Sequence, residues 1–174
     1  MEVSSREALD AAIVIALGSN LAGGFASSEA LLNAAVGELV EAGLSVARRS
    51  SWWRSAAWPD PSGPEYRNGV LLVEAELDAR AVLRRLQDLE ARFDRARSIP
   101  NAPRTLDLDL IAHGRVRIEA PDLVLPHPRA HERLFVMGPL AEIAPDWRHP
   151  VLDRTAAELA ATATVGRDAA PTAG

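Results

Sequence analysis

The order of apolar patterns along the chain is the feature that most restricts its fold. Stretches in which apolar residues run together or alternate predict strands, and stretches in which they recur every three to four residues predict helices. Taken in sequence, the patterns give the order strand, helix, strand, strand, helix, strand. The predicted strands cover about residues 11–17, 44–55, 67–77 and 105–112, and the predicted helices cover about residues 28–42 and 78–93.

This order predicts an α+β fold of the ferredoxin-like kind. In such a split β-α-β sandwich the sheet is antiparallel, and we expect the helices to pack on one of its faces. A hairpin partner for the last strand is predicted at 115–118, with short helices near 131–135 and 155–161. The fold alone does not assign an activity, because this architecture also occurs in phosphatases, regulatory modules and RNA-binding domains.

The length predicts one domain, because 174 residues can bury one core but are too few for two. Residues 1–10 are expected to form an N-terminal extension, and residues 11–162 the single domain. Residues 163–174 end in DAAPTAG and are expected to be a disordered tail.

The chain contains no lysine, and this absence excludes several ways of handling phosphate. A Walker-type phosphate loop, a Schiff-base enzyme and a protein kinase each depend on a lysine amine. Arginine and metal ions are therefore the groups that would bind any phosphate. A formal net charge of −5 also argues against a broad nucleic-acid-binding surface, which needs many positive charges.

Cysteine is also absent, which excludes disulfides, thiolate nucleophiles and cysteine-based zinc sites. The start of the chain has no cationic segment followed by an apolar stretch, so it does not resemble a signal peptide. The longest aliphatic run, residues 11–17, is too short to span a bilayer. We therefore expect a cytoplasmic protein that has no membrane partner.

The strongest local signal is the alternating segment that contains Asp107 and Asp109. Side chains alternate between the two faces of a strand, so both carboxylates are predicted on one face, roughly 7 Å apart, with the intervening leucines in the core. Two carboxylates can hold magnesium, which completes its coordination with waters and substrate phosphates. The alternative is an ordinary strand whose acidic face is merely solvated.

Three arginines precede this strand. Arg95, Arg97 and Arg104 lie within one short segment, so guanidinium groups that bind phosphate oxygens would be next to carboxylates that bind metal. Arg95 and Arg97 fit equally well at the solvated end of a helix, where the helix dipole favours positive charge.

Further candidates are His127 in LPHPR, Tyr66 and Phe135. Nothing local marks His127 as a general base, so we interpret it as a hydrogen-bond donor to phosphate; a lone histidine is more often a structural residue. Tyr66 and Phe135, taken singly, would be assigned to packing.

Taken together, these segments resemble the hydroxymethyldihydropterin pyrophosphokinases across about residues 13–150. The resemblance is carried by Gly18-Ser19-Asn20-Leu21, Tyr66-x-Asn68, the segment PRTLDLD at 103–109, LPHPR at 125–129, Arg133-x-Phe135 and Pro139-Leu140-x-Glu142-Ile143-x-Pro145. The segment RTLDLD followed by LPHPR is the most specific part of this pattern.

The resemblance implies a role for each matching residue. Asp107 and Asp109 would hold two Mg²⁺ ions, and Tyr66 and Phe135 would enclose the flat pterin. The pterin edge would be read by Asn68 and by main-chain groups near Ser55 and Ala56. ATP would be bound by Gln87, Glu90, Arg95, Arg97, Arg104, His127 and Arg133. The catalytic set would be Arg95, Arg97, Arg104, Asp107 and Asp109.

The implied activity is transfer of pyrophosphate from ATP to 6-hydroxymethyl-7,8-dihydropterin, which gives the pterin diphosphate and AMP in tetrahydrofolate biosynthesis. Dihydropteroate synthase would be a functional neighbour, and no nucleic acid would be involved. Two alternatives stay open: a metal-dependent phosphoesterase that uses Asp-x-Asp for hydrolysis, and a ferredoxin-like RNA-binding or regulatory module, which the acidic charge disfavours.

Overall fold

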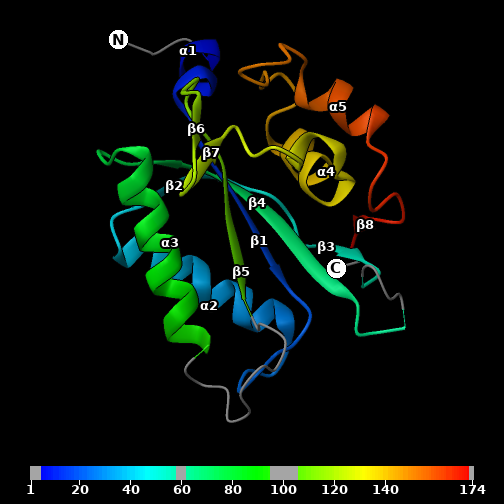
Figure 1. The fold of residues 1–174 in the computed structure, drawn as a ribbon. Helices are drawn as coiled ribbons and strands as arrows, with labels where there is room; N and C mark the ends of the chain where they lie inside the picture. Colours follow the sequence, from blue (N-terminus) through cyan, green and yellow to red (C-terminus); the bar gives the residue numbers. More distant parts are fainter. Residues whose placement is uncertain (1–4, 58–61, 95–105, 173–174) are drawn as a thin grey trace.

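The computed structural model describes residues 5–57, 62–94 and 106–172, and their arrangement is shown in Figure 1. In chain order the elements are α1 (Ser5–Ala11), β1 (Ile13–Ser19), α2 (Ser28–Glu41), β2 (Ser45–Arg49), β3 (Trp53–Ser55), β4 (Tyr66–Glu74), α3 (Ala79–Asp94), β5 (Asp107–His113), β6 (Ile118–Ala120), β7 (Leu123–Leu125), a 3-10 helix (Ala130–Glu132), α4 (Leu134–Ile143), α5 (Ala156–Thr162) and β8 (Ala170–Pro171). Among these described residues, no helix is both long and apolar enough to cross a membrane.

The main sheet has the order β5-β1-β4-β3-β8, and β2 also pairs with β4. Every pair in it is antiparallel, so the predicted α+β class with an antiparallel sheet is confirmed. The central strand β1 lies between β4 and β5, so strands that are far apart in the sequence become neighbours.

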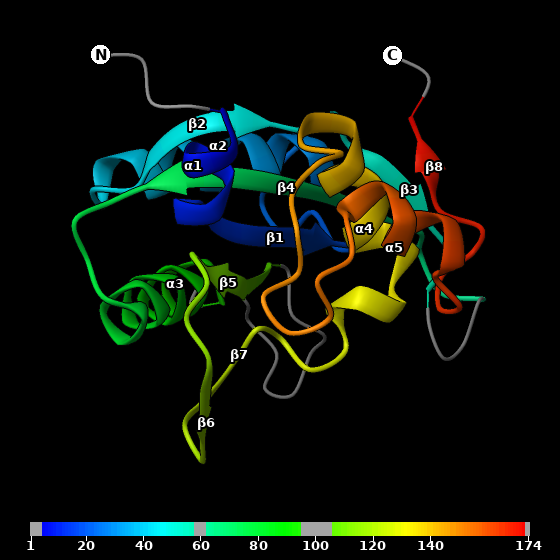
Figure 2. The same ribbon diagram turned by 90° about the horizontal axis from the view of Figure 1, so that it is seen from above.

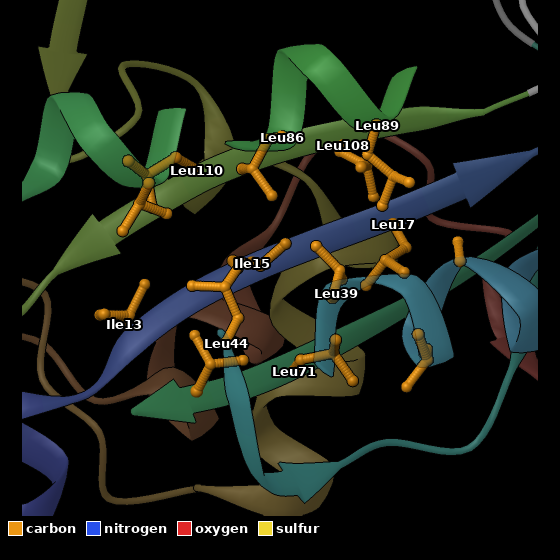
Figure 3. Close-up of a cluster of buried hydrophobic side chains, with 14 of the residues drawn as sticks. Ile13, Ile15, Leu17, Leu39, Leu44, Leu71, Leu86, Leu89, Leu108 and Leu110 are labelled. Atoms are coloured by element: carbon orange, nitrogen blue, oxygen red, sulfur yellow. The ribbon is translucent and has the colours of Figure 1, made fainter. Parts of the chain in front are cut away.

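Both faces of this sheet are covered, so the expectation that helices pack on one face only is wrong. All seven residues of β1 are buried, which requires protein on both sides of the strand. Ile13, Ile15 and Leu17 belong to the core cluster that α2 and α3 cover (Figure 3), whereas Val14 and Ala16 belong to the cluster beneath α4 and α5. Figure 1 shows these two helix pairs on opposite sides of the sheet.

The length of α4, in the second helical layer, was underestimated because its sequence lacks apolar residues that alternate with polar ones at helical spacing. Residues 131–135, predicted as a short helix, instead contain the end of the 3-10 helix and the first two residues of α4, which continues to Ile143. Pro139 lies inside α4, where it removes an intrahelical hydrogen bond. Burial of Val136, Met137 and Leu140 against the sheet stabilises the helix despite this loss.

The predicted strand 44–55 is divided into β2 and β3. Its register against β4 shifts between Val46 and Arg48, and the strand then breaks at 50–52. Within the break, the Ser50 main-chain N–H donates to the Val70 carbonyl (3.0 Å) and the Ser50 hydroxyl accepts from the Val70 N–H (2.9 Å). The break places the buried Trp52 ring directly over Gly69.

Replacement of Gly69 by alanine is expected to destabilise the protein by about 1–3 kcal/mol through overpacking. A Cβ atom at Gly69 would lie 2.4 Å from Cζ3 of Trp52, and this buried ring has little room to move. The measurement is the free energy of unfolding from urea denaturation. The exposed Gly37 of α2 is the matched control, because a Cβ there meets nothing within 4 Å and Gly37→Ala should stabilise the helix by about 0.5–1 kcal/mol. Equal stabilities of the Gly69→Ala variant and the parent would contradict this packing.

The predicted hairpin partner of the last central strand is also corrected. Ile118–Ala120 pairs with Leu123–Leu125 in a separate small sheet and not with β5. After β5 the chain turns at Gly114 (φ 57°), whose N–H donates to the Ala12 carbonyl, and so leaves the plane of the main sheet. Figure 2 shows the resulting β6–β7 hairpin extending away from the sheet.

The two ends of the chain take defined courses in the described part. Residues 5–11 form α1, and Leu9 packs against the second core cluster. Residues 163–172, expected to be part of a disordered tail, instead return to the sheet, where Ala170–Pro171 form β8 beside β3 (Figure 2). The composition of this segment is typical of a disordered tail, but Ala163 and Ala169 are buried in the folded chain. The free energy gained by this burial offsets the entropy lost on ordering the segment, and the local sequence pattern does not reveal it.

Candidate active site

A cavity of about 360 Å³ lies where β1 and β3 end and β4 and β5 begin. The strand register explains its position: Gly18 lies opposite Asn68 on one side and Asp107 on the other. Ala16 lies opposite Asp109. Because glycine and alanine have little or no side chain, the space above this end of β1 stays open, and this volume falls in the range of small-molecule sites.

The two acidic residues of β5 both line this cavity, as the alternating pattern predicted. Leu108, between them, is buried in the core on the opposite face of the sheet. The Leu108 N–H donates to the Glu90 carboxylate (3.0 Å), which ties the start of β5 to α3. The carboxylates are therefore presented to the cavity by a strand that is anchored on its other side.

A bulge in β5 brings His127 to the same region. The register against β1 slips so that Ile111 has no partner in the ladder, and its carbonyl accepts the main-chain N–H of His127 (2.8 Å). Nδ1 of His127 accepts the Arg129 N–H (3.1 Å), so the neutral ring carries its proton on Nε2. Burial lowers the pKa of His127, the Asp109 carboxylate opposes this shift, and Arg133 adds to it.

The aromatic part of the cavity is formed by Tyr66 at the start of β4 and Phe135 at the start of α4. Burial raises the pKa of the Tyr66 phenol, and the Asp107 carboxylate raises it further. Asn68 of β4 also lines the cavity, and its buried side-chain amide donates to the Ser55 hydroxyl (2.9 Å). This bond fixes the orientation of the amide at the base of the cavity.

The structure brings most of the predicted site residues together and leaves others apart. The predicted residues that line the cavity are Ser55, Ala56, Tyr66, Asn68, Asp107, Asp109, Arg133 and Phe135. Gln87 and Glu90 of α3 and the half-buried His127 do not line it. Arg95, Arg97 and Arg104 lie outside the described residues.

Several cavity residues were not predicted. Arg129 lines the cavity beside Arg133, and the sequence signal for it was its place at the end of LPHPR. Glu132, Val136 and Val165 also line the cavity. Val165 gave no sequence signal, because it lies in the segment that was expected to be disordered.

The donor set of the cavity fits a hard divalent cation that also binds phosphate. Within the described part of the chain, no group of three or more His, Cys, Asp or Glu side chains could hold a metal ion. Asp107 and Asp109 nevertheless supply two carboxylates to one cavity. That number suits magnesium, which is usually bound by one or two carboxylates and otherwise by waters and substrate phosphates.

Fold and site together define a class of protein. The molecule is an α+β sandwich domain in which one cavity combines paired carboxylates and two arginines with two aromatic rings, an arrangement suited to phosphoryl transfer onto a flat acceptor.

Comparison with known proteins identifies the family within this class. The sequence model of the 7,8-dihydro-6-hydroxymethylpterin-pyrophosphokinase (HPPK) family matches residues 14–145. This match spans most of the chain, and the chain belongs to that family.

Individual relatives agree with this assignment. The 2-amino-4-hydroxy-6-hydroxymethyldihydropteridine pyrophosphokinase of Synechocystis is 43% identical over 129 residues, which are 74% of this chain and 66% of that protein. The enzyme of the same name from Methylorubrum extorquens is 35% identical and is matched over 76% of this chain and 82% of its own length. The folic acid synthesis protein fol1 of Pneumocystis carinii is 33% identical over 86% of this chain, which spans only 20% of that protein.

Among solved structures, wild-type Plasmodium falciparum HPPK-DHPS has a TM-score of 0.64 at 12% identity. The match covers 86% of this chain and 44% of that one. At this identity the comparison supports the fold alone.

Proposed function

We propose that this chain transfers the pyrophosphoryl group of ATP to 6-hydroxymethyl-7,8-dihydropterin, giving the pterin diphosphate and AMP in tetrahydrofolate biosynthesis. The hydroxymethyl oxygen forms a bond to the β-phosphorus of ATP, and the bond from that phosphorus to the oxygen shared with the α-phosphorus breaks. AMP leaves with the electron pair, and the hydroxyl proton is released. The observation that carries the proposal is a single cavity whose lining combines two aromatic rings and the Asn68 amide with two carboxylates and two arginines.

The aromatic residues of the cavity suit the pterin. Tyr66 and Phe135 offer ring faces to a flat heterocycle, and such stacking is favourable for any π system. The Asn68 amide is held by Ser55 and can pair with the polar ring edge, so that heterocycles with a different edge leave it unpaired. Selectivity for the pterin follows from that penalty.

The charged residues of the cavity suit the triphosphate. We assign Asp107 and Asp109 as the ligands of two Mg²⁺ ions, which when bound would neutralise phosphate charge and polarise the phosphoryl oxygens. Arg129 and Arg133 line the same cavity and can bind phosphate oxygens through their guanidinium groups. Their fixed positive charge would stabilise negative charge that develops on the transferred group.

Residues beside the cavity complete the assignment. The proton on Nε2 of His127 can be donated to a phosphate oxygen, which agrees with its role as a donor and not a base. Arg95, Arg97 and Arg104 remain assigned to ATP and to the transition state by family resemblance. Gln87 and Glu90 remain assigned to ATP on the same ground, although Glu90 already accepts from Leu108.

The proposal is tested by incubating the protein with ATP, Mg²⁺ and 6-hydroxymethyl-7,8-dihydropterin and separating the nucleotides by chromatography. AMP is expected only when the pterin is present, in a one-to-one ratio with pterin diphosphate. Inorganic phosphate released without the pterin would instead support a phosphoesterase. A gel shift with RNA at physiological salt, in the absence of any pterin-dependent AMP, would support a nucleic-acid-binding module.

We also propose that a dihydropteroate synthase uses the product of this chain. Among the solved structures, HPPK and DHPS are named together for one chain, HPPK-DHPS of Plasmodium falciparum. This joint occurrence supports a functional link between the two activities. In this chain the link would operate through the diffusing pterin diphosphate. A coupled assay with the separate synthase would measure it.

A further inference from the structure

The chain after α5 folds back over the candidate site. The main-chain N–H groups of Thr164 and Val165 both donate to the Glu132 carbonyl (3.0 and 2.9 Å), and the Leu134 N–H donates to the Val165 carbonyl (2.9 Å). These bonds hold the segment against the start of α4 and make Val165 part of the cavity wall. The segment lies beyond residues 14–145, so the family match does not account for it.

The same segment packs against the Phe135 ring. A Cβ atom at Gly166 would lie 2.4 Å from Cδ1 of Phe135, so the ring rests directly on this glycine. Gly166 has a positive φ of 69°, which glycine adopts without the strain that a side chain would introduce. The position of the ring in the cavity therefore depends on a residue outside the helix that carries it.

A third contact reaches the chain that follows β3. The main-chain N–H of Ala56 donates to Oδ2 of Asp168 (2.6 Å), two residues past the last paired residues of β3 and β8, Arg54 and Ala170. The Asp168 side chain thus continues the contact between the two segments beyond the main-chain pairing of β3 with β8. The Thr172 N–H, which donates to the Trp52 carbonyl (3.0 Å), secures the other end of the same pairing.

From these contacts we infer that residues 163–172 form a structural wall of the acceptor site, and that Asp168 is a positioning residue that holds the Ala56 main chain in that wall. The inference rests on the proposed function, because it takes the ligand that stacks on Tyr66 and Phe135 to be the pterin. The segment bridges the Phe135 side and the Ala56 side of one cavity, so it sets the spacing between the ring and the strand edge. Among the residues that the structure describes, Asp168 makes no hydrogen bond to Asp107, Asp109, Arg129 or Arg133, so ATP binding should be unaffected.

The test compares Asp168→Ala with Asp168→Asn in the full chain. Asparagine retains an oxygen that accepts the Ala56 N–H, whereas alanine removes it. Asp168→Ala is expected to raise the KM for the pterin about tenfold with the KM for ATP little changed, and Asp168→Asn should restore most of the loss. Calorimetric titration of the pterin, in the presence of a non-hydrolysable ATP analogue and Mg²⁺, should show the same pattern without turnover.

A second variant tests the Phe135 side. Gly166→Ala places a methyl group where the ring lies, so it should raise the KM for the pterin and leave that for ATP nearly unchanged. The exposed Asp122→Ala, on the turn between β6 and β7, is a control for loss of a surface carboxylate away from the cavity and should leave both constants unchanged.

The outcomes separate this inference from the proposed function. An unchanged pterin KM in Asp168→Ala, or equal losses for both substrates in Asp168→Ala and Asp168→Asn, would overturn the inference while wild-type turnover still supports the function. Failure of the wild-type chain to form AMP with the pterin would overturn the function and, with it, the assigned ligand. In that case faster hydrogen exchange of the Ala56 amide in Asp168→Ala would still establish the contact itself.

Discussion

Replacement of Asp109 by alanine is expected to reduce turnover by at least about a thousandfold, and the same holds for Asp107. Both carboxylates line the cavity on the face of β5 opposite to the buried Leu108, and both are assigned to the metal ions of the triphosphate. Loss of one removes charge neutralisation where the transferred group becomes most negative. The measurement is single-turnover formation of AMP at saturating ATP, pterin and Mg²⁺.

The fold should survive either change, because Asp109 is exposed and Asp107 is only partly buried. Glu119→Ala, an exposed acidic residue on β6, is the matched control and should keep wild-type turnover. A second readout needs no chemistry: Mg²⁺ with a non-hydrolysable ATP analogue should raise the melting temperature of the parent and raise that of Asp109→Ala much less. Near wild-type turnover in Asp109→Ala would remove this carboxylate from the metal site.

Replacement of Phe135 by alanine is expected to raise the KM for the pterin by roughly 10–100-fold, because stacking on an aromatic side chain contributes about 1–3 kcal/mol per ring. Phe135 lines the cavity, and its ring lies directly against Gly166. The KM for ATP should change far less. Steady-state kinetics with each substrate varied in turn gives both values.

Phe135→Leu is the matched control for this change. Leucine keeps most of the apolar bulk and removes the flat π face, so it should recover only part of the pterin affinity if stacking contributes. Full recovery by leucine would show that Phe135 only fills space. Equal losses for pterin and ATP in Phe135→Ala would contradict a specific contact with the acceptor.

The sequence predicted the chemistry of the site where that chemistry follows from local geometry. Asp107 and Asp109 share a face because side chains alternate along any strand, and no knowledge of the neighbouring strands was needed. The two central helices and the antiparallel order of the sheet were likewise readable from periodicity. Family resemblance then grouped Tyr66, Asn68 and Phe135, which the structure places around one cavity.

Other expectations failed because packing overrode the local pattern. Helices cover both faces of the sheet, and the second layer is formed by α4 and α5. The full length of α4 was not predicted because Gly138 and Pro139, which are unfavourable inside helices, lie within it. The hairpin after β5 pairs with itself because the chain leaves the sheet at Gly114. Residues 163–172 return to the sheet, where Ala170 and Pro171 pair with β3, although the composition of the segment resembles a tail.

The sequence by itself determined which chemical groups this protein can use. It supplies two carboxylates on one strand, arginine as the strongly basic side chain and aromatic rings for stacking, and it contains no lysine amine and no cysteine thiol. Only the tertiary structure decided which of them meet. The bulge at Ile111 brings His127 beside the acidic strand, and the return of the chain at 163–172 places Asp168 against Ala56. Such contacts join residues that are far apart in the sequence. Their free energy depends on how several helices and strands bury one another, and a local sequence pattern contains no information about that packing.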